Sequence, residues 1–241
     1  MIRALAATVA GAAVVQAGPG ITGLAPVRIA LFPGLAGLGR PDHVALTFDD
    51  GPDQAVTPLF LDALSSTGTR ATFFLLGSRA AMMPRLAAEI VSAGHEVAVH
   101  GWQHRYLILR GPLGTYDDLA RTVDVITAAT GSVPRYFRPP YGVLSGPAIL
   151  AARRLGLTTV LWSCWGREWT TGATPATVFA TLQADLRGGA TVLLHDSDDT
   201  CRAGSADAAL GALPLLLEEC AQRRLEVGPL TEHGLAQPGA K

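Results

Sequence analysis

The chain has 241 residues, of which 49% are hydrophobic, and its formal net charge at pH 7 is -1. This length is sufficient for one large core, and single α/β barrel domains reach this size. The 19 lysines and arginines form no basic cluster, which removes the electrostatic basis for binding nucleic acid or an anionic membrane. Three cysteines without CxxC spacing, Cys164, Cys201 and Cys220, argue against a zinc knuckle and a disulfide scaffold. A small or neutral ligand is the expected partner, with no stable membrane insertion.

The first 42 residues are expected to precede the main domain. Arg3 is followed by an apolar run, residues 4–17, whose length and final Val15-Gln16-Ala17 are typical of a signal peptide and its cleavage site. The run is too short to span a bilayer well. The pattern favours export, and the alternative is an Ala-rich helix packed on a cytoplasmic protein. Residues 18–42 are expected to form a Gly- and Pro-rich lead-in outside the core, so that the main domain covers residues 43–241.

After residue 42, short apolar or β-branched runs alternate with longer amphipathic stretches. The runs predict seven strands, at residues 43–48, 71–77, 95–100, 135–139, 158–163, 190–195 and 225–230. The stretches between them predict six helices, at residues 57–67, 79–93, 115–130, 145–155, 174–187 and 206–223. The strands are almost continuously apolar, which is typical of a parallel sheet covered by helices on both faces. An open doubly wound sheet and a barrel both fit this pattern.

Polar residues end or follow successive predicted strands. They are Asp49, Asp50, His100, Arg138, Glu168 and His195. A barrel brings the carboxyl ends of its strands into one ring, whereas an open sheet spreads them along an edge. We therefore expect an α/β fold, a distorted (β/α) barrel of about seven parallel strands, with the functional site at the carboxyl ends of the strands.

The sequence HGWQH places His100 and His104 one helical turn apart, a spacing that lets two imidazoles face the same metal. Taken alone, the spacing fits a structural pair equally well. A carboxylate from the first strand would complete a three-ligand site that keeps positions for water and substrate. One of the adjacent carboxylates, Asp49 or Asp50, would bind the cation, and the other would stay nearby as a base.

Two further residues are candidates for supporting this chemistry. Arg138 could hold Asp49 ionised, because arginine pairs bidentately with carboxylates, although a single loop arginine is more often a surface residue. His195 ends a strand too apolar to leave it solvated, which makes it a candidate general acid. A buried structural histidine is the alternative for this position.

Four motifs in order resemble those of the polysaccharide deacetylase family, metal-dependent carbohydrate esterases related to chitin-oligosaccharide and cell-wall peptidoglycan N-deacetylases. They are TFDDGP (47–52), HGWQH (100–104), RPPY (138–141) and LLH (193–195). The resemblance covers about residues 43–230. It implies a divalent metal, most commonly zinc with cobalt or nickel as alternatives, and hydrolysis of an acetamido group on a sugar of an N-acetylated glycan.

The resemblance also implies a role for each matching residue. In catalysis, Asp49 would be the general base, Arg138 would orient Asp49, His195 would be the general acid, and the backbone N–H of Tyr141 would stabilise the oxyanion. The implied metal ligands are Asp50, His100 and His104. The residues implied to line the pocket for the acetyl methyl group are Leu193 and Trp169.

One motif departs from the family pattern, in which a Trp is followed by two Asp, the second of them preceding another Trp. Here the stretch is WSCWGREW, residues 162–169, with Trp165 at the first Asp position and Glu168 at the second. Glu168 keeps the charge, so a pairing that raises the pKa of His195 for acid duty is still feasible. Trp165 fits a stacking platform for a sugar ring and a core position equally well.

The leading hypothesis is a metal-dependent hydrolase that removes N-acetyl groups from N-acetylglucosamine-type residues of an oligo- or polysaccharide. Within enzymes, the alternative is hydrolysis of another non-peptide C–N bond, such as that of a cyclic imide or amide. From a different class comes a carbohydrate-binding homologue without catalysis, suggested by Trp165 and the altered motif. The completeness of the acid, base and metal set favours the enzyme.

Overall fold

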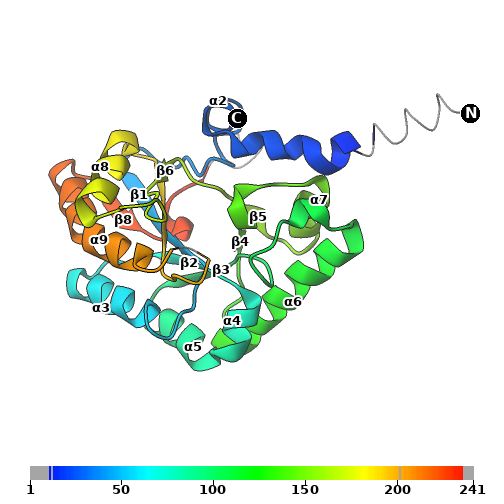
Figure 1. The fold of residues 1–241 in the computed structure, drawn as a ribbon, viewed down its shortest axis with the longest axis horizontal. Helices are drawn as coiled ribbons and strands as arrows, with labels where there is room; N and C mark the ends of the chain where they lie inside the picture. The colour runs from blue at the N-terminus through cyan, green and yellow to red at the C-terminus, as the bar shows by residue number, and fades with distance from the viewer. Residues whose placement is uncertain (1–10, 12, 201, 236–241) are drawn as a thin grey trace, which may run out of the picture.

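A curled, all-parallel sheet forms the centre of the computed structural model, which describes residues 11, 13–200 and 202–235 (Figure 1). Within these residues the strands lie in the order β5-β4-β3-β2-β1-β7-β6, and β8 pairs with the first half of β1. Their bounds are β1 (His43–Asp49), β2 (Thr72–Leu75), β3 (Glu96–Val99), β4 (Tyr136–Phe137), β5 (Thr158–Thr159), β6 (Cys164–Trp165), β7 (Thr191–His195) and β8 (Glu226–Gly228). The barrel is distorted, as predicted, and it is open on one side, because β5 and β6 stand at the two ends of this order.

Helices surround the sheet in Figure 1 and cover its outer face. Their bounds are α2 (Ala25–Leu31), α3 (Thr57–Thr67), α4 (Gly77–Met82), α5 (Pro84–Ser92), α6 (Pro112–Thr130), α7 (Gly146–Arg154), α8 (Pro175–Asp185) and α9 (Ser205–Gln222), with short 3-10 turns η1 (Gly18–Gly23), η2 (Leu107–Leu109), η3 (Pro140–Gly142) and η4 (Leu230–Glu232). β1 lies between β2 and β7, and all seven of its residues are buried. Burial on both faces is why the sequence between His43 and Asp49 is apolar except for Thr47.

Two elements differ from the sequence predictions. The single helix predicted over 79–93 is two helices that meet at Met83, because the ring of Pro84 disfavours helical backbone in the residue before it. The short strand β6 was not predicted, since its two residues lie in a Ser-, Gly- and Trp-containing stretch with no apolar run.

The predicted lead-in fills the open side of the barrel, so the prediction that it lies outside the core is wrong. Ala36 is fully buried, and the backbone N–H of Leu161 donates to the Leu35 carbonyl at 2.7 Å. On its other side the lead-in contacts β7, where the Thr191 hydroxyl donates to the Gly37 carbonyl at 2.6 Å. A Cβ on Gly37 would lie 2.5 Å from that hydroxyl, so glycine is required there.

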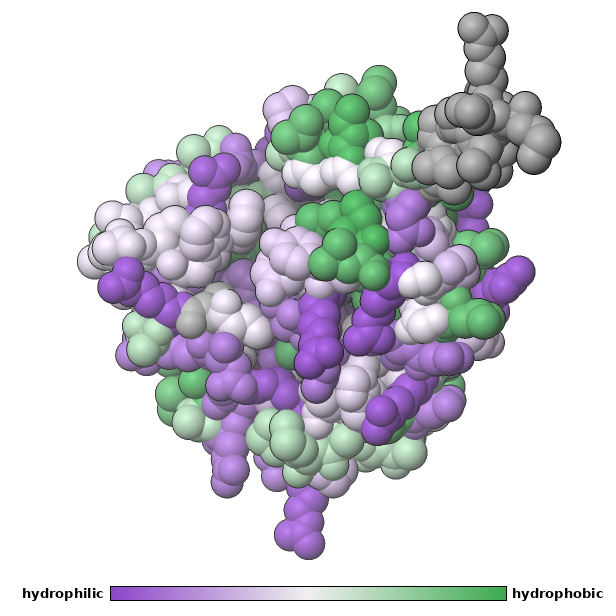
Figure 2. Space-filling model, turned by 45° about the vertical axis from the view of Figure 1, so that its right-hand side comes forward, coloured by the Kyte–Doolittle hydropathy of each residue, from purple (hydrophilic) through white to green (hydrophobic). Residues whose placement is uncertain are grey.

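The boundary predicted at residues 42 and 43 stays a prediction, and most of the leader predicted at residues 1–17 lies outside the described residues. Exposed apolar side chains of the N-terminal elements include Ile21, Leu24, Leu31 and Phe32. Figure 2 shows apolar surface gathered at the top of the molecule, the level at which α2 lies in Figure 1. Within the described part of the chain, every helix is too short or too polar to cross a bilayer. Cys164 and Cys220 are free thiols, and Cys201 is outside the described residues.

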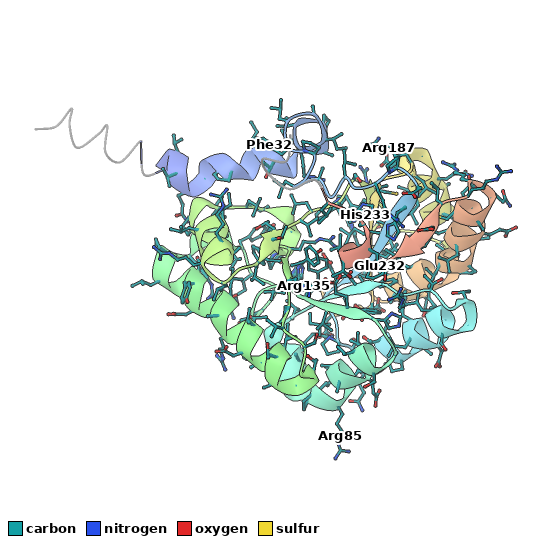
Figure 3. All side chains as sticks on the ribbon, turned by 180° about the vertical axis from the view of Figure 1, so that it is seen from behind. Phe32, Arg85, Arg135, Arg187, Glu232 and His233 are labelled. Atoms are coloured by element: carbon teal, nitrogen blue, oxygen red, sulfur yellow. The ribbon has the colours of Figure 1, made fainter. Side chains whose placement is uncertain are left out.

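A buried histidine pair joins the start of β1 to the C-terminal segment, opposite the carboxyl ends of the strands. Nδ1 of His43 lies 2.8 Å from Nδ1 of His233, which Figure 3 shows beside Glu232. Nε2 of His233 faces two carbonyl oxygens, of Gly37 at 3.0 Å and Gly189 at 3.2 Å, so this nitrogen must carry the proton. Nδ1 of His233 then accepts a hydrogen bond from Nδ1–H of His43, which requires that the His233 ring is neutral. Burial lowers the pKa of His233 to about 4 and lowers the pKa of His43 as well.

Acid is therefore expected to destabilise the protein through this pair. Between about pH 6.5 and pH 4 the unfolded chain takes up a proton at His233 that the folded chain refuses, so the free energy of unfolding falls as pH falls. For His233 alone the loss between pH 8 and pH 5 is about 2 kcal/mol. Thermal unfolding at both pH values should show that His233→Gln, which can keep the bonds to the carbonyls, loses roughly 4 to 8 °C less than the wild type. Equal losses in the two proteins would contradict the assignment.

Candidate active site

The two adjacent carboxylates lie at the carboxyl end of β1, where the sheet brings other polar side chains around them. Asp49 is the last residue of β1, and the strand register places it directly beside His195 of β7. Asp50 leaves the strand with φ at 77°, the left-handed region. Both carboxylates face Nε2 of His100, with Oδ2 of Asp49 at 3.7 Å and Oδ1 of Asp50 at 3.2 Å. Both carboxylates are buried, at 2% and 1% exposure. Two buried like charges require compensating cationic partners.

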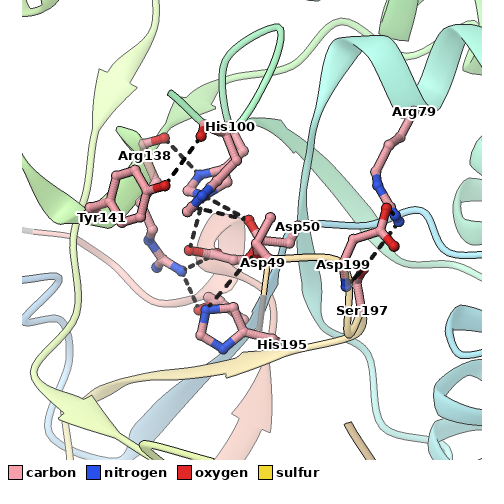
Figure 4. A network of polar contacts seen from close by, with 12 residues as sticks. Asp49, Asp50, Arg79, His100, Arg138, Tyr141, His195, Ser197 and Asp199 are labelled. Carbon is pink, nitrogen blue, oxygen red and sulfur yellow. Dashed lines mark hydrogen bonds and ion pairs between the residues drawn. The ribbon is translucent and has the colours of Figure 1, made fainter. Parts of the chain in front are cut away.

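Arg138 supplies one of these partners. It follows β4, is fully buried, and donates through Nη1 to Oδ1 of Asp49 at 2.6 Å. The other guanidinium nitrogens donate to the carbonyls of Val160 at 3.3 Å and Leu161 at 2.9 Å, so the group is held on three sides. Figure 4 shows Asp49 between Arg138 and the histidines. With Oδ1 bound by Arg138, Oδ2 of Asp49 is the oxygen that remains to take a proton.

Asp50, His100 and His104 form the group of described residues that could hold a metal ion, with ligand atoms all within 4.8 Å of one another. Oδ1 of Asp50 lies 3.2 Å from Nε2 of His100 and 3.5 Å from Nε2 of His104. The spacing of the two histidines corresponds to one helical turn, but the structure has no helix there. Residues 100–104 form a bend after β3, which brings the centroids of the two rings to 5.4 Å.

The protonation pattern of this group fits a cation. Nδ1 of His100 lies 2.9 Å from the Arg138 carbonyl and must donate to it, so the neutral form of this ring carries its lone pair on Nε2. Burial lowers the pKa of His104 to about 4, so its imidazole is neutral at neutral pH. Burial alone would raise the pKa of Asp50, but the surrounding histidines lower it overall, and its Oδ1 has no hydrogen-bond partner. Two imidazole nitrogens and one carboxylate oxygen that face one another are a typical ligand set for zinc.

His195 and Glu168 form a second ion pair on the other side of Asp50. Nδ1 of His195 lies 2.8 Å from Oε1 of Glu168, which is 1% exposed, and Nε2 lies 3.9 Å from Oδ2 of Asp50. Burial alone would lower the pKa of His195, but the charge and hydrogen bond of Glu168, together with Asp50 and Asp49, raise it to about 9. The longer glutamate arm therefore reaches the histidine, and the imidazolium persists at neutral pH.

The residues predicted to contact substrate lie around this centre with different exposures. Tyr141 has a left-handed φ of 60° and is half-exposed, with its ring 4.2 Å from that of His104. Leu193 is buried beside Trp165, whose indole lies between two other tryptophans. Trp169 is 43% exposed at the outer end of this cluster. Trp165 is thus a partly exposed member of a packed aromatic cluster, and its role toward a sugar stays a prediction.

Two polar residues near the centre were missed by sequence reasoning. Thr200 donates a hydrogen bond to Oδ2 of Asp50 from the loop after β7, and nothing in the sequence around Thr200 indicates this contact. The Asp196 carboxyl is fully buried and accepts from the Thr57 hydroxyl at 2.5 Å. Burial and the charge of Asp50 raise the pKa of Asp196 to about 7. Its place directly after His195 was a signal that could have identified it.

Comparisons with known proteins agree with this geometry. Residues 37–160 match the family model for polysaccharide deacetylase. A chitooligosaccharide deacetylase of Bradyrhizobium sp. (strain ANU 289) is 35% identical over 78% of this chain and 89% of that protein. Among solved structures, a family 4 carbohydrate esterase from Streptomyces lividans in complex with acetate is 31% identical, with a TM-score of 0.69 over 82% of this chain and 98% of that chain. A CE4 family pseudoenzyme from Bacillus anthracis is 26% identical, with a TM-score of 0.74 over 81% and 67% of the two chains. On the family match and the extent of these similarities, the chain belongs to the polysaccharide deacetylase family.

Proposed function

We propose that the protein is a metal-dependent hydrolase that removes N-acetyl groups from N-acetylglucosamine-type residues of an oligo- or polysaccharide. The observation that carries the proposal is the inward-facing acceptor set of Asp50, His100 and His104 beside a separate buried carboxylate, Asp49. The similarity to a chitooligosaccharide deacetylase supports the same substrate class. Zinc is the expected ion because the donors are two imidazoles and one carboxylate.

A bound divalent ion would polarise the acetyl carbonyl and lower the pKa of water. The chain's own residues supply the proton transfers. Oδ2 of Asp49 takes a proton from the attacking water as its oxygen bonds to the acetyl carbon, and the Tyr141 N–H donates to the developing oxyanion. Nε2–H of His195 then gives its proton to the amine nitrogen as the C–N bond breaks. The products are acetate and a free amino sugar.

The direct test is acetate release from N-acetylglucosamine oligomers by the purified protein, as isolated, after chelation, and with zinc, cobalt or nickel restored. Release that disappears on chelation and returns with metal is expected. A folded, metal-loaded protein that releases no acetate would overturn the proposal. Ring opening of a cyclic imide in the same assay would then identify the alternative C–N hydrolase, and oligomer binding without turnover would identify a pseudoenzyme like the Bacillus anthracis relative.

Glu168→Gln is expected to move the alkaline side of the pH–rate profile to lower pH by about 1 to 2 units. His195 can act as an acid only while protonated, so the rate falls as pH rises through its pKa. Removing the Glu168 charge lowers that pKa, and the fall then begins at lower pH. The measurement is kcat/KM against pH at constant zinc, with Glu226→Gln, an exposed glutamate at the opposite end of the barrel, as control. If the alkaline side of the profile does not move in Glu168→Gln, the ion pair between Glu168 and His195 does not set the pKa at which His195 acts as the acid.

A further inference from the structure

Arg28 of the N-terminal lead-in is a buried guanidinium with an unusual set of partners. It is 1% exposed, and it makes no ion pair with a carboxylate among the described residues. Nε and Nη2 both donate to the Trp162 carbonyl, at 3.2 and 2.9 Å, and Nη1 donates to the carbonyls of Thr22 at 2.7 Å and Gly23 at 3.2 Å. Burial lowers the pKa of Arg28 to about 10, which leaves it charged at neutral pH. A buried charge satisfied only by carbonyls holds those carbonyls strongly.

The carbonyl that Arg28 holds belongs to the segment on which Arg138 rests. Arg138 donates to the carbonyls of Val160 and Leu161, and Arg28 donates to the next one, that of Trp162. Two guanidinium groups thus fix three consecutive carbonyls between β5 and β6, on the side where the barrel is open. In Figure 1, α2, which carries Arg28, lies between these two strands. A shift of this segment would move Arg138 and, with it, Asp49.

The Trp162 side chain extends the same support to the other wall of the site. Its ring centroid lies 5.1 Å from Cζ of Arg28 and 5.8 Å from Cζ of Arg138. A Cβ added to Gly142 would lie 2.5 Å from the Trp162 indole, so this ring packs directly on the turn that holds the Tyr141 backbone. Trp162, whose carbonyl Arg28 holds, therefore contacts both Arg138, which supports Asp49, and the turn that carries the Tyr141 N–H.

We propose that Arg28 is a positioning residue for deacetylation: through Trp162, it fixes the segment that supports Arg138 and the turn that carries Tyr141. Arg28 itself touches neither the substrate nor the reacting atoms. The inference rests on the proposed function and deepens it, because it makes the N-terminal lead-in a part of the catalytic unit.

The test compares Arg28→Met, Arg28→Lys and the control Gln16→Ala, all made in the full 241-residue chain, which keeps residues 1–17. Gln16 lies just before the lead-in and donates to the carbonyls of Ile108 at 2.7 Å and Arg110 at 3.0 Å, next to η2. Among the described residues it makes no hydrogen bond to Trp162. At temperatures where all variants are folded, Arg28→Met should lower kcat about 10- to 100-fold with unchanged KM and zinc content. Arg28→Lys, which can still reach the carbonyl with one donor, should recover part of the loss. Gln16→Ala should keep the wild-type kcat.

A second readout does not depend on activity. The 15Nε–Hε resonance of Arg138 should shift in Arg28→Met and stay in place in Gln16→Ala. Wild-type kcat together with an unmoved Arg138 resonance in Arg28→Met would overturn the inference, as would an equal loss of kcat in Gln16→Ala. If Arg28→Met does not fold, Arg28→Lys decides by the same criteria. An inactive wild-type protein would instead refute the proposed function, while the resonance still tests the packing that Arg28 provides.

Discussion

Asp49→Asn is expected to lower kcat for deacetylation by about 10²- to 10⁴-fold while zinc content and KM stay close to wild type. The amide matches the carboxylate in shape, and its oxygen can still accept from Arg138, which lies 2.6 Å from the native Oδ1. It cannot take the proton of the attacking water. The loss therefore falls on turnover, and steady-state acetate release with metal analysis of the same sample measures it.

The matched control is Asp53→Asn, on the same loop. An asparagine oxygen at this position keeps the hydrogen bonds from the backbone N–H groups of Ala55 and Val56, so activity should stay within a few-fold of wild type. Asp49→Asn with near wild-type turnover would remove Asp49 from the role of base. Asp49→Asn without bound zinc would make it a metal ligand instead.

His100→Ala is expected to weaken metal binding and to abolish activity. The substitution removes one of three protein ligands and with it the contact between Nδ1 and the Arg138 carbonyl, which orients the ring. Zinc titration of the chelated protein should show an affinity lower by at least about 10- to 100-fold.

His95 provides the control because it lies at the opposite end of the same strand as His100. There its Nδ1 accepts from the Ala71 backbone N–H at 3.2 Å, a bond that the oxygen of His95→Asn can accept in its place. His95→Asn should bind zinc as wild type does. Full zinc affinity in His100→Ala, or equal losses in the two variants, would contradict the proposed ligand set.

Much of the barrel could be predicted from sequence because its signal is local. Between His43 and Asp49, β1 is apolar except for Thr47, since β2 and β7 cover its edges and helices cover the sheet. The carboxylates begin where the strand ends, at Asp49. The strands β4 and β5 are only two residues long, yet the sequence around each of them, residues 135–139 and 158–163, was enough to predict a strand. β6 escaped prediction because it has no apolar run, and its pairing with β7 depends on contacts made elsewhere.

The site divides in the same way. Spacing and position at strand ends predict that His100 and His104 lie beside one of the two adjacent carboxylates, and the family resemblance indicates Asp50 rather than Asp49. The pairing of Arg138 with Asp49 could also be predicted, but its bonds to the carbonyls of Val160 and Leu161 could not, because backbone groups leave no trace in the side-chain pattern. Arg28 was not noticed for a related reason: an arginine in a Gly- and Pro-rich segment gives no sign that a tertiary contact buries it.

The seam filled by the N-terminal segment has a consequence for the order in which this protein folds. The contact between Arg28 and Trp162 spans 134 residues of chain, and that between Gly37 and Thr191 spans 154. Pairings this distant in sequence form slowly, because the loop between them must be closed before they contribute stability. During synthesis, the lead-in leaves the ribosome before β5, β6 and β7, and it cannot dock until they have followed. A segment that is made before the barrel is thus among the last to pack against it, and the support of Arg138 is complete only then.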